Sequence, residues 1–357
     1  MKILTIIGAR PQFIKASVIS RLIKSRRDIE EVIVHSGQHF DNNMSDIFFE
    51  EMDIPKPNYN LNVHGVNHGA MTGQMLEKIE TVLLQEKPDW VVVYGDTNTT
   101  LAGALAARKL HIKLAHIEAG LRSYNMDMPE EINRILTDRI SNLLFCPTAA
   151  AILNLEKEGY KTIGCKIINS GDVMQDAAIF YTSKARKPVV DLPKKFILCT
   201  IHRAENTDNT NSFKEIFDAL EMISLETTVV FPLHPRTKNK LNEMKFNFSN
   251  TRIQFIEPMG YLEMVYLLKK CNLVMTDSGG LQKEAYFFKK PCLTLREETE
   301  WVELVENGFN KICGSNKENI LSEYRNSQKN YIPNLGLNLY GDGHAGEQIL
   351  EAMKFYQ

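Results

Sequence analysis

The chain has 357 residues, more than the roughly 250–300 at which a single hydrophobic core stops growing, so two domains are expected. Its 42 Lys and Arg nearly cancel 44 Asp and Glu, without a run of five like charges, which argues against nucleic-acid binding. The 6 cysteines lack metal-site spacing and no apolar stretch reaches about 18 residues, which favours a reduced, cytoplasmic protein without a membrane span.

Short β-branched segments alternate with longer segments of helical periodicity along the chain. In the first half, strands are predicted at KILTIIG, EEVIVHS, WVVVYGD and KLAHIEAG, each followed by a helical segment. The alternation resumes with KFILCTIH, TTVVFPLH, RIQFIEP, NLVMTDS and KPCLTL. Buried parallel strands that alternate with helices are typical of doubly wound sheets, so we expect an α/β protein with two Rossmann-like domains.

The domain boundaries are predicted from changes in composition. Residues 1–180 are expected to form the N-terminal domain and residues 196–343 the C-terminal domain. Residues 181–195, polar and basic with two prolines, are interpreted as a linker. Residues 344–357 have the periodicity of an amphipathic helix, a candidate to pack back on the N-terminal domain.

Polar residues follow the predicted strands, and ligands of open α/β sheets bind outside the carboxyl ends of strands. These residues are Gly8, Arg10, His39, Asp96 and Glu118 in the first series and His202, His234, Asp277 and Ser278 in the second. Two domains with polar strand ends that face each other predict an interdomain cleft.

Two turns are candidates for a phosphate site. TDSGGLQKEA, residues 276–285, is a strand end, a small-residue turn and a helix start, where backbone N–H groups and the helix dipole suit an anion. Glu284 could accept hydrogen bonds from two ribose hydroxyls. Alternatively, the same residues are also explained by an ordinary helix N-cap followed by a glycine turn, without a ligand. In GARPQFIK, Arg10 and Lys15 are either phosphate ligands or solvated residues of a helix start. Neither GxxxxGK[ST] nor GxGxxG occurs there, which argues against a Walker A loop and a nicotinamide cofactor.

Acids between residues 94 and 148 are candidates for proton transfer. Asp96 and Glu118 end two consecutive strands, where desolvation can raise the pKa of a carboxyl group into the range of general acid–base catalysis. Glu130 and Glu131 in MPEEINR are either catalytic acids or helix-start residues favoured by the dipole.

His202 and His234 are either hydrogen-bonded strand-end residues or members of the same site. No His, Asp and Glu set has the short spacing of a two-His zinc helix, and no G-x-S-x-G nucleophile elbow occurs.

The ordered motifs from residue 3 to beyond 340 resemble the non-hydrolysing UDP-N-acetylglucosamine 2-epimerases of bacteria and archaea. They are GARPQFIK, SGQH, YGDTNTT, HIEAGLR, PEEINR, GDVMQDA, HRAEN, PLHPRT, TDSGGLQKEA, REETEW and YGDGHA. The resemblance implies a GT-B-like fold, a homodimer, a UDP-sugar substrate in the cleft, and no metal or redox cofactor. It also implies inversion at C2: UDP leaves by anti elimination as the C2 proton is removed, and the 2-acetamidoglucal is reprotonated on the other face before UDP adds back.

The resemblance assigns roles residue by residue. The family's catalytic residues fall on Asp96, Glu118, Glu130 and His202. Its diphosphate and nucleotide contacts fall on Arg10, Lys15, Ser278, Gly279, Gly280 and Glu284. An allosteric UDP-sugar site in many members would involve Gln38, His39 and His234, although the arginine expected around His68 is missing.

Two motifs depart from the family members that act on UDP-N-acetylglucosamine, which usually have GTRPE and TERPE. This chain has GARPQ and TEWVE, so Trp301 replaces an arginine expected to reach the ligand, and Met259 and Met264 replace Gln and Phe near the base. These versions resemble the branch that epimerises UDP-2,3-diacetamido-2,3-dideoxyglucuronate to its manno form for surface polysaccharide, including O-antigen. A uronate requires an extra cation, which the sequence does not identify.

Three alternatives share parts of this pattern. A hydrolysing epimerase would release free N-acetylmannosamine and UDP. A GT-B glycosyltransferase would share the SGG turn and Glu284 but gives no reason for three acids in the first domain. A non-catalytic UDP-sugar sensor would not need the acids, so their presence favours the epimerase.

Overall fold

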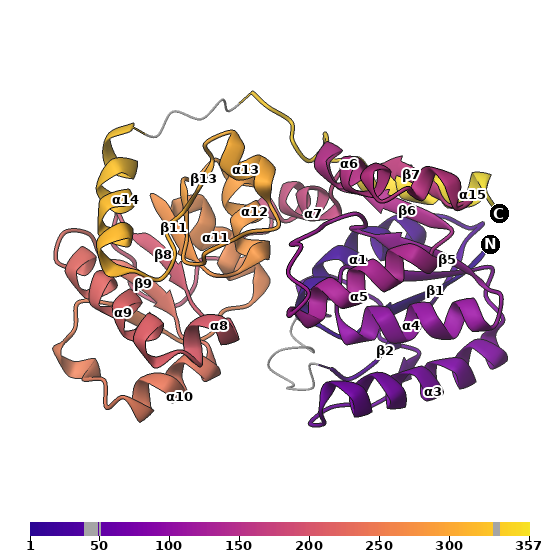
Figure 1. Ribbon diagram of the computed structural model, residues 1–357, viewed down its shortest axis with the longest axis horizontal. Helices are drawn as coiled ribbons and strands as arrows, with labels where there is room; N and C mark the ends of the chain where they lie inside the picture. Colours follow the sequence, from indigo (N-terminus) through magenta and orange to yellow (C-terminus); the bar gives the residue numbers. More distant parts are fainter. Residues whose placement is uncertain (39–48, 50, 331–335) are drawn as a thin grey trace. The chain divides into compact units, whose positions relative to one another are not determined.

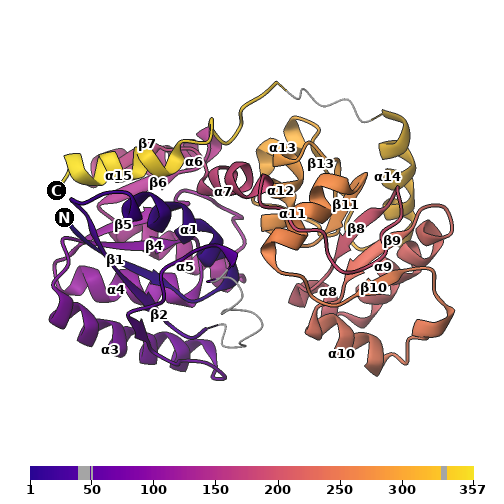
Figure 2. The same cartoon turned by 180° about the vertical axis from the view of Figure 1, so that it is seen from behind.

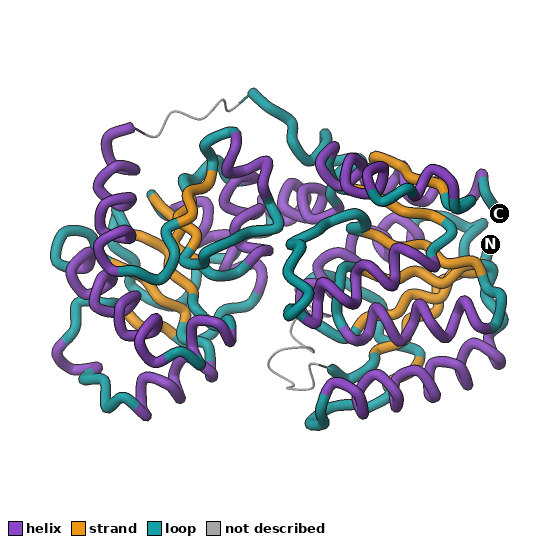
Figure 3. The backbone as a smooth tube through the Cα atoms, viewed as in Figure 1, coloured by secondary structure: helices purple, strands orange, loops and turns teal. Residues whose placement is uncertain are grey.

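The computed structural model describes residues 1–38, 49, 51–330 and 336–357. Within them the chain forms two compact units, Met1–Phe180 together with Asn338–Gln357, and Tyr181–Leu337 (Figure 1). In each unit the strands of a parallel sheet lie between helices (Figure 3). Across these described ranges, we find no helix with the length and apolar character that crossing a bilayer requires.

The sheet of the first unit has the strand order β3-β2-β1-β4-β5-β6-β7. Its strands are β1 (Lys2–Ile7), β2 (Glu30–His35), β3 (Tyr59–Asn60), β4 (Trp90–Tyr94), β5 (Lys113–Ile117), β6 (Leu143–Cys146) and β7 (Lys166–Asn169). Its helices are α1 (Arg10–Lys24), α3 (His68–Glu86), α4 (Asn98–Lys109), α5 (Pro129–Ile140), α6 (Ala149–Lys157), η1 (Tyr160–Thr162), α7 (Val173–Thr182) and α15 (Ala345–Phe355).

The sheet of the second unit has the strand order β10-β9-β8-β11-β12-β13. Its strands are β8 (Ile197–Thr200), β9 (Val229–Pro232), β10 (Gln254–Ile256), β11 (Leu273–Thr276), β12 (Cys292–Thr294) and β13 (Asn310–Ile312). Its helices are α8 (Ala204–Thr207), α9 (Thr210–Ser224), α10 (Pro235–Glu243), η2 (Phe248–Asn250), α11 (Tyr261–Lys270), α12 (Gly279–Phe287), α13 (Val302–Glu306) and α14 (Lys317–Asn330).

Both sheets are doubly wound, which confirms the predicted α/β class. The strand order reverses between β1 and β4 in the first unit and between β8 and β11 in the second. Ligands of such sheets bind at the carboxyl ends of the strands beside this reversal. The turns after β1, β4, β8 and β11 are therefore the places where site residues are expected. Of the predicted candidates, Arg10, Asp96, His202 and Ser278 follow these strands, whereas Glu118 follows β5, Glu130 lies in α5 and His234 follows β9.

The core of the first unit explains why its strands are continuous apolar runs. Strand β4 reads Trp-Val-Val-Val-Tyr and is buried throughout, because helices cover both faces of a parallel sheet. Helix α4 packs so closely on the sheet that a Cβ atom at Gly103 would lie 2.7 Å from Ile6 Cδ1. This close packing fixes the start of α4, and with it the turn that follows β4.

The C-terminal segment belongs to the first unit. Asp172 N donates to Tyr340 O at 2.8 Å, and helix α15 lies along α1 (Figure 2). A Cβ atom on Gly346 of α15 would lie 2.8 Å from Val18 Cγ1 of α1. Residues 338–343 thus pack with the first unit, whereas the sequence pattern put them in the second, and residues 181–195, expected as a linker, group with the second unit.

Candidate active site

Gln12 joins the turns that follow β1 and β4. Its Oε1 accepts hydrogen bonds from Gly8 N at 2.8 Å and Ala9 N at 3.0 Å, and its Nε2 donates to Tyr94 O at 2.9 Å. An amide can do both because it carries a donor and an acceptor, whereas a carboxylate only accepts. Gln12 therefore locks the turn that carries Arg10, the first residue of α1, to the strand end before Asp96.

Glu118 forms a buried ion pair with Lys15. The Lys15 ammonium contacts Oε1 of Glu118, and each side chain is only 8% exposed. Glu118 has a φ of 71°, and Gly95 after β4 has a φ of 63°. A Cβ atom on Gly95 would lie 3.1 Å from Lys15 Nζ, so the ion pair sits directly against the turn after β4. Lys15, a predicted phosphate contact, is thus a partner of a candidate acid.

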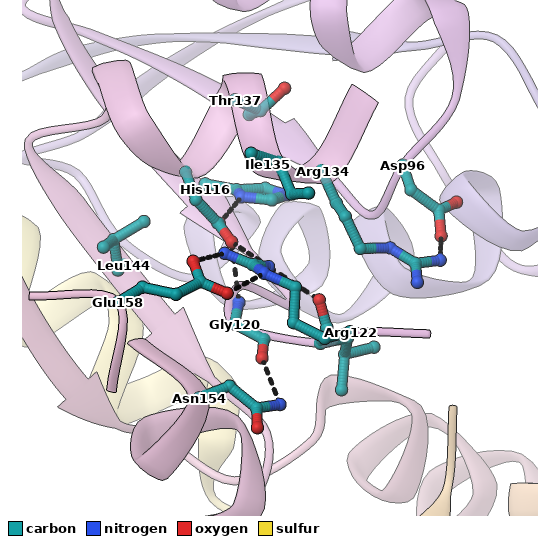
Figure 4. A network of polar contacts seen from close by, with 12 residues as sticks. Asp96, His116, Gly120, Arg122, Arg134, Ile135, Thr137, Leu144, Asn154 and Glu158 are labelled. Atoms are coloured by element: carbon teal, nitrogen blue, oxygen red, sulfur yellow. Dashed lines mark hydrogen bonds and ion pairs between the residues drawn. The ribbon is translucent and has the colours of Figure 1, made fainter. Parts of the chain in front are cut away.

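Asp96 is held by two residues of α5. Its Oδ2 contacts Nη2 of Arg134 (Figure 4), and its backbone carbonyl accepts a hydrogen bond from Asn133 Nδ2 at 2.9 Å. The Asp96 side chain remains 30% exposed, whereas Arg134 is buried. Asp96 and Glu118 therefore stand at the ends of neighbouring strands, each with a cation beside it, and the aspartate still reaches solvent.

The two glutamates of MPEEINR have different environments. Glu131 is fully buried and accepts from Ser123 N and Oγ at 3.0 Å each and from Tyr124 N at 2.9 Å. It also pairs with Arg134 Nη1 at 2.8 Å. These bonds tie the preceding loop to α5 and support the helix-start interpretation of Glu131. Glu130, in the same turn, is half-buried.

In the second unit, Asp277 organises the end of β8. Its buried carboxylate accepts from the backbone N–H groups of His202, at 3.1 and 3.0 Å, and Arg203, at 2.9 Å. The His202 ring lies beside it, with Nδ1 at 3.6 Å from Oδ1. The His234 ring is 5.3 Å from the His202 ring, centroid to centroid, so residues that the resemblance gave to two different sites lie in one place.

The SGG turn begins α12, with Ser278 as the N-cap and Gly279 and Gly280 as the first two helical residues. The Ser278 side chain makes no capping bond, and the turn packs against the REETEW loop. A Cβ atom on Gly279 would lie 2.2 Å from Glu300 Oε1 and 3.3 Å from Trp301 Nε1, so a larger residue there would displace the Glu300 carboxylate.

Two buried residues of α12 lie beside this turn. The Lys283 ammonium sits 4.1 Å from the centroid of the Trp301 ring, and both residues are buried, as is Glu284. Trp301, which stands where an arginine was expected, therefore packs against a buried cation.

Gln38 joins the first-unit site. Its Oε1 accepts from Thr99 Oγ1 at 2.8 Å and Thr99 N at 3.3 Å, at the start of α4. His39 lies outside the described residues. His68, where an arginine was expected, instead has Nδ1 at 3.0 Å from Asn98 Nδ2. In the part of the chain that the structure describes, no cluster of three His, Cys, Asp or Glu side chains could hold a metal ion.

Several residues of the site were missed from sequence. They are Gln12, Asn133 and Arg134, together with the buried pair His116 and Asp138 described below. For His116, a polar side chain inside the apolar run KLAHI was the available signal, because such residues are seldom fully buried without a partner.

The fold and site define a class: an α/β enzyme with ion-paired carboxylates at the strand ends of one nucleotide-binding-type domain and a glycine turn with histidines in the other. A family model described as UDP-N-acetylglucosamine 2-epimerase matches residues 21–354. The chain therefore belongs to the UDP-N-acetylglucosamine 2-epimerase family, which confirms the family, the isomerase class and the GT-B-like pair of Rossmann domains inferred from sequence.

Individual relatives match over nearly their whole length. The chain is 56% identical over 353 residues to the UDP-2,3-diacetamido-2,3-dideoxy-D-glucuronate 2-epimerase of Pseudomonas aeruginosa, covering 98% of this chain and 99% of the relative. It is 45% identical over 373 residues to the UDP-N-acetylglucosamine 2-epimerase of Methanocaldococcus jannaschii, covering 99% of each. The crystal structure of the Methanocaldococcus jannaschii enzyme in complex with UDP-GlcNAc and UDP matches with a TM-score of 0.92 at 44% identity, covering 99% of this chain and 100% of that one.

Proposed function

We propose that the protein inverts C2 of a UDP-2-acetamido sugar by eliminating UDP and adding it back. The observation that carries the proposal is the pair of ion-paired carboxylates, Asp96 and Glu118, at the ends of the adjacent strands β4 and β5. Family membership supports the reaction, because the relatives across the whole length of the chain are epimerases of UDP-sugars.

The stereochemistry of this reaction dictates what the protein must supply. Substrate and product differ only at C2, so one proton leaves one face of C2 and another enters the opposite face. As the C2–H bond breaks, its electron pair forms the C1=C2 double bond, and the C1–O bond breaks so that UDP departs with the second pair. On return, C2 takes a proton and a UDP oxygen bonds to C1. Acids on both faces of C2 are therefore required.

Asp96 and Glu118, with Glu130 as a third acid, meet this requirement. The first two are ion-paired with Arg134 and Lys15. In the proposed reaction one acid takes the proton from C2, and another acid, in its protonated form, delivers a proton to the opposite face. In this proposal two of the three acids serve opposite faces of C2, and their cationic partners limit the repulsion between carboxylates and an anionic substrate.

The departing diphosphate needs positive groups that hold it until it returns. Arg10 at the start of α1 offers a guanidinium fork, and the turn that begins with Ser278 offers the N-terminal N–H groups of α12. His202, next to buried Asp277, is the candidate that stabilises charge on the leaving oxygen. Glu284, one turn into α12, is proposed to bind the ribose hydroxyls.

Within the family, we propose UDP-2,3-diacetamido-2,3-dideoxy-D-glucuronate as the substrate. The relative that bears this name is 56% identical to the chain, compared with 45% for the Methanocaldococcus jannaschii UDP-N-acetylglucosamine enzyme. Gln12 and Trp301, two of the positions where the chain departs from the UDP-N-acetylglucosamine group, are both buried and packed into the site turns. The product would be consumed in surface polysaccharide synthesis.

A homodimer in the cytoplasm is also part of the proposal. The cysteines carry free thiols, which suits a reducing compartment. On the outer face of α5, Ile132 and Leu136 lie one turn apart and are 40% and 45% exposed, which offers an apolar surface for a second copy. Sedimentation velocity should give a dimer for the wild type and a monomer for Leu136→Glu; a monomeric wild type would remove the dimer from the proposal.

The reaction and the substrate are tested together by hydrogen exchange. The purified protein is incubated in D2O with UDP-GlcNAc and, separately, with the diacetamido glucuronate, and C2 is followed by proton NMR. We expect deuterium at C2 and a manno product, with the uronate at least tenfold faster. No exchange with either substrate would overturn the proposal, and release of the free sugar with UDP would identify the hydrolysing variant instead.

The residue roles are tested by amide substitutions. Asp96→Asn, Glu118→Gln and Glu130→Gln should each abolish C2 exchange while UDP binding, measured by calorimetry, remains. Glu77→Gln, on the exposed face of α3, is the matched control and should exchange like the wild type. A variant with near-normal turnover would take its residue out of the scheme.

A further inference from the structure

We propose that His116 and Asp138 are positioning residues that hold the turns carrying Asp96 and Glu118 in register for proton transfer. This inference rests on the proposed function, since it concerns the placement of the acids that the function requires. The two residues form a fully buried pair, with His116 Nδ1 at 2.7 Å from Asp138 Oδ1.

His116 fixes the turn after β4. It lies in β5, and its Nε2 is 2.7 Å from the carbonyl oxygen of Gly95, the residue before Asp96. The backbone N–H of Gly95 donates to Ile117 O at 3.0 Å. Both polar backbone groups of Gly95 are therefore bound by β5, so the direction in which Asp96 leaves the strand depends on the His116 ring.

Asp138 fixes the turn after β5. Its Oδ2 accepts from Gly120 N at 3.1 Å and from Arg122 Nη1 at 2.7 Å. Gly120 follows Glu118 by two residues and has a φ of 81° in the left-handed region. One carboxylate on α5 thus holds the Glu118 turn directly and, through His116, the Asp96 turn.

The charges of this network alternate in sign, which makes its burial tolerable. Arg122 continues the chain to Glu158, with Nε to Oε1 at 2.7 Å and Nη2 to Oε2 at 2.8 Å. Burial alone would raise the pKa of Asp138, but the hydrogen bonds and charges of His116 and Arg122 outweigh it and hold that pKa below its usual value. Both groups that face the ring nitrogens of His116, the Gly95 carbonyl and the Asp138 carboxylate, are hydrogen-bond acceptors.

A network of this kind affects turnover more than binding. A displacement of about 1 Å between a catalytic group and its reacting atom can lower the rate by about 100-fold. Loss of the network should therefore lower kcat sharply and leave the KM for the UDP-sugar within about threefold, because His116 and Asp138 do not themselves contact substrate in this proposal. A smaller folded fraction would also lower the apparent kcat at unchanged KM, so kcat is expressed per mole of folded enzyme, counted from the stoichiometry of UDP binding in calorimetry.

The test compares conservative and disruptive variants at each position. In Asp138→Asn, the amide oxygen can still accept from Gly120 and Arg122, and the amide nitrogen can donate to a neutral His116 ring, which keeps every hydrogen bond. Asp138→Ala keeps none of them. His116→Gln retains a donor for the Gly95 carbonyl, and His116→Leu does not.

We expect Asp138→Asn to keep at least a fifth of wild-type kcat and Asp138→Ala to lose about 100-fold at little-changed KM. The histidine pair should show the same order, and it carries the test if Asp138→Ala fails to fold. Asp127→Ala, an exposed acid before α5, is the control.

Equal losses of kcat in the two Asp138 variants would overturn the inference, and so would a near-normal kcat in His116→Leu. Exchange at C2 by the wild type is measured in parallel. Its absence would instead overturn the proposed function, so the two failures are distinct.

Discussion

Gly95→Ala tests directly whether the turn after β4 supports the Lys15–Glu118 ion pair. Gly95 has a φ of 63°, a conformation that costs a residue with a Cβ atom roughly 1–2 kcal/mol. Alanine also restricts the unfolded chain, which stabilises the folded state by about 0.4–1 kcal/mol, so the net loss in the free energy of unfolding should be about 1 kcal/mol. For a unit of this size, that loss lowers Tm by roughly 2–4 °C.

The added methyl group also approaches Lys15 and the proposed catalytic acid Glu118. It would lie 3.1 Å from Lys15 Nζ and 3.4 Å from Glu118 Oε1, closer to the ammonium than ordinary van der Waals contact. Both side chains are 8% exposed, so they can yield only by moving together. We therefore expect kcat to fall at least tenfold, since a displaced acid is a poorer proton acceptor or donor for C2.

Gly159→Ala separates the backbone effect from the contact effect. Gly159 has a φ of 79°, and a Cβ atom there would have nothing within 4 Å. Thermal unfolding should show similar losses for both variants, whereas C2 exchange in D2O should fall only for Gly95→Ala. Normal exchange in Gly95→Ala, or an equal loss in Gly159→Ala, would refute the argument.

Three further predictions concern stability. Glu131→Ala should destabilise the protein by roughly 3–5 kcal/mol, measured by urea unfolding. The substitution removes one of the partners of buried Arg134 and the acceptor of three hydrogen bonds from the loop. A loss of stability below about 1 kcal/mol would contradict this prediction. Trp301→Arg should cost roughly 3–5 kcal/mol by setting a second buried cation against Lys283, and adding Lys283→Glu should recover most of that stability by turning the repulsion into an ion pair. Burial raises the pKa of the Asp176 carboxyl group. The stability that this group contributes is therefore present below about pH 3.8 and is lost as the pH rises through its pKa in the folded protein. Asp176→Asn should remove this loss of stability, which is measured as the change in the free energy of unfolding between pH 4 and pH 7.

The parts of the site that lie at strand ends could be predicted from sequence. Parallel strands place their carboxyl ends at one edge, so alternating apolar runs and helices were enough to bring Asp96 and Glu118 to neighbouring positions on β4 and β5. The same reasoning placed His202 and Asp277 each at a strand end, and the structure shows that these strands, β8 and β11, pair in the second sheet. In each case the position follows from the local pattern and the topology alone.

The partners of these residues could not be predicted in the same way. Lys15 meets Glu118 across 103 residues of sequence, and this pairing depends on how α1 packs over the sheet. Periodicity predicts which face of a helix is buried, but not which side chain of another element it meets. Glu131 lies in the first turn of α5, where either a catalytic acid or a structural helix-start residue could stand. The hydrogen bonds that it accepts from the loop at Ser123 and Tyr124 show that its role is structural, and the sequence does not predict that this loop folds back onto it.

The pairing of acids with cations also explains how a nearly neutral chain can handle an anionic substrate. The net charge is −2, so the protein provides no general positive field that would offset a cluster of carboxylates beside a diphosphate. Instead each acid at the first-unit strand ends has a local cation, Arg134 for Asp96 and Lys15 for Glu118, and the turns behind them rest on the buried contacts of His116 and Asp138. Charge is thus balanced residue by residue, and the acids can stay close together without the large mutual repulsion that would otherwise drive them apart.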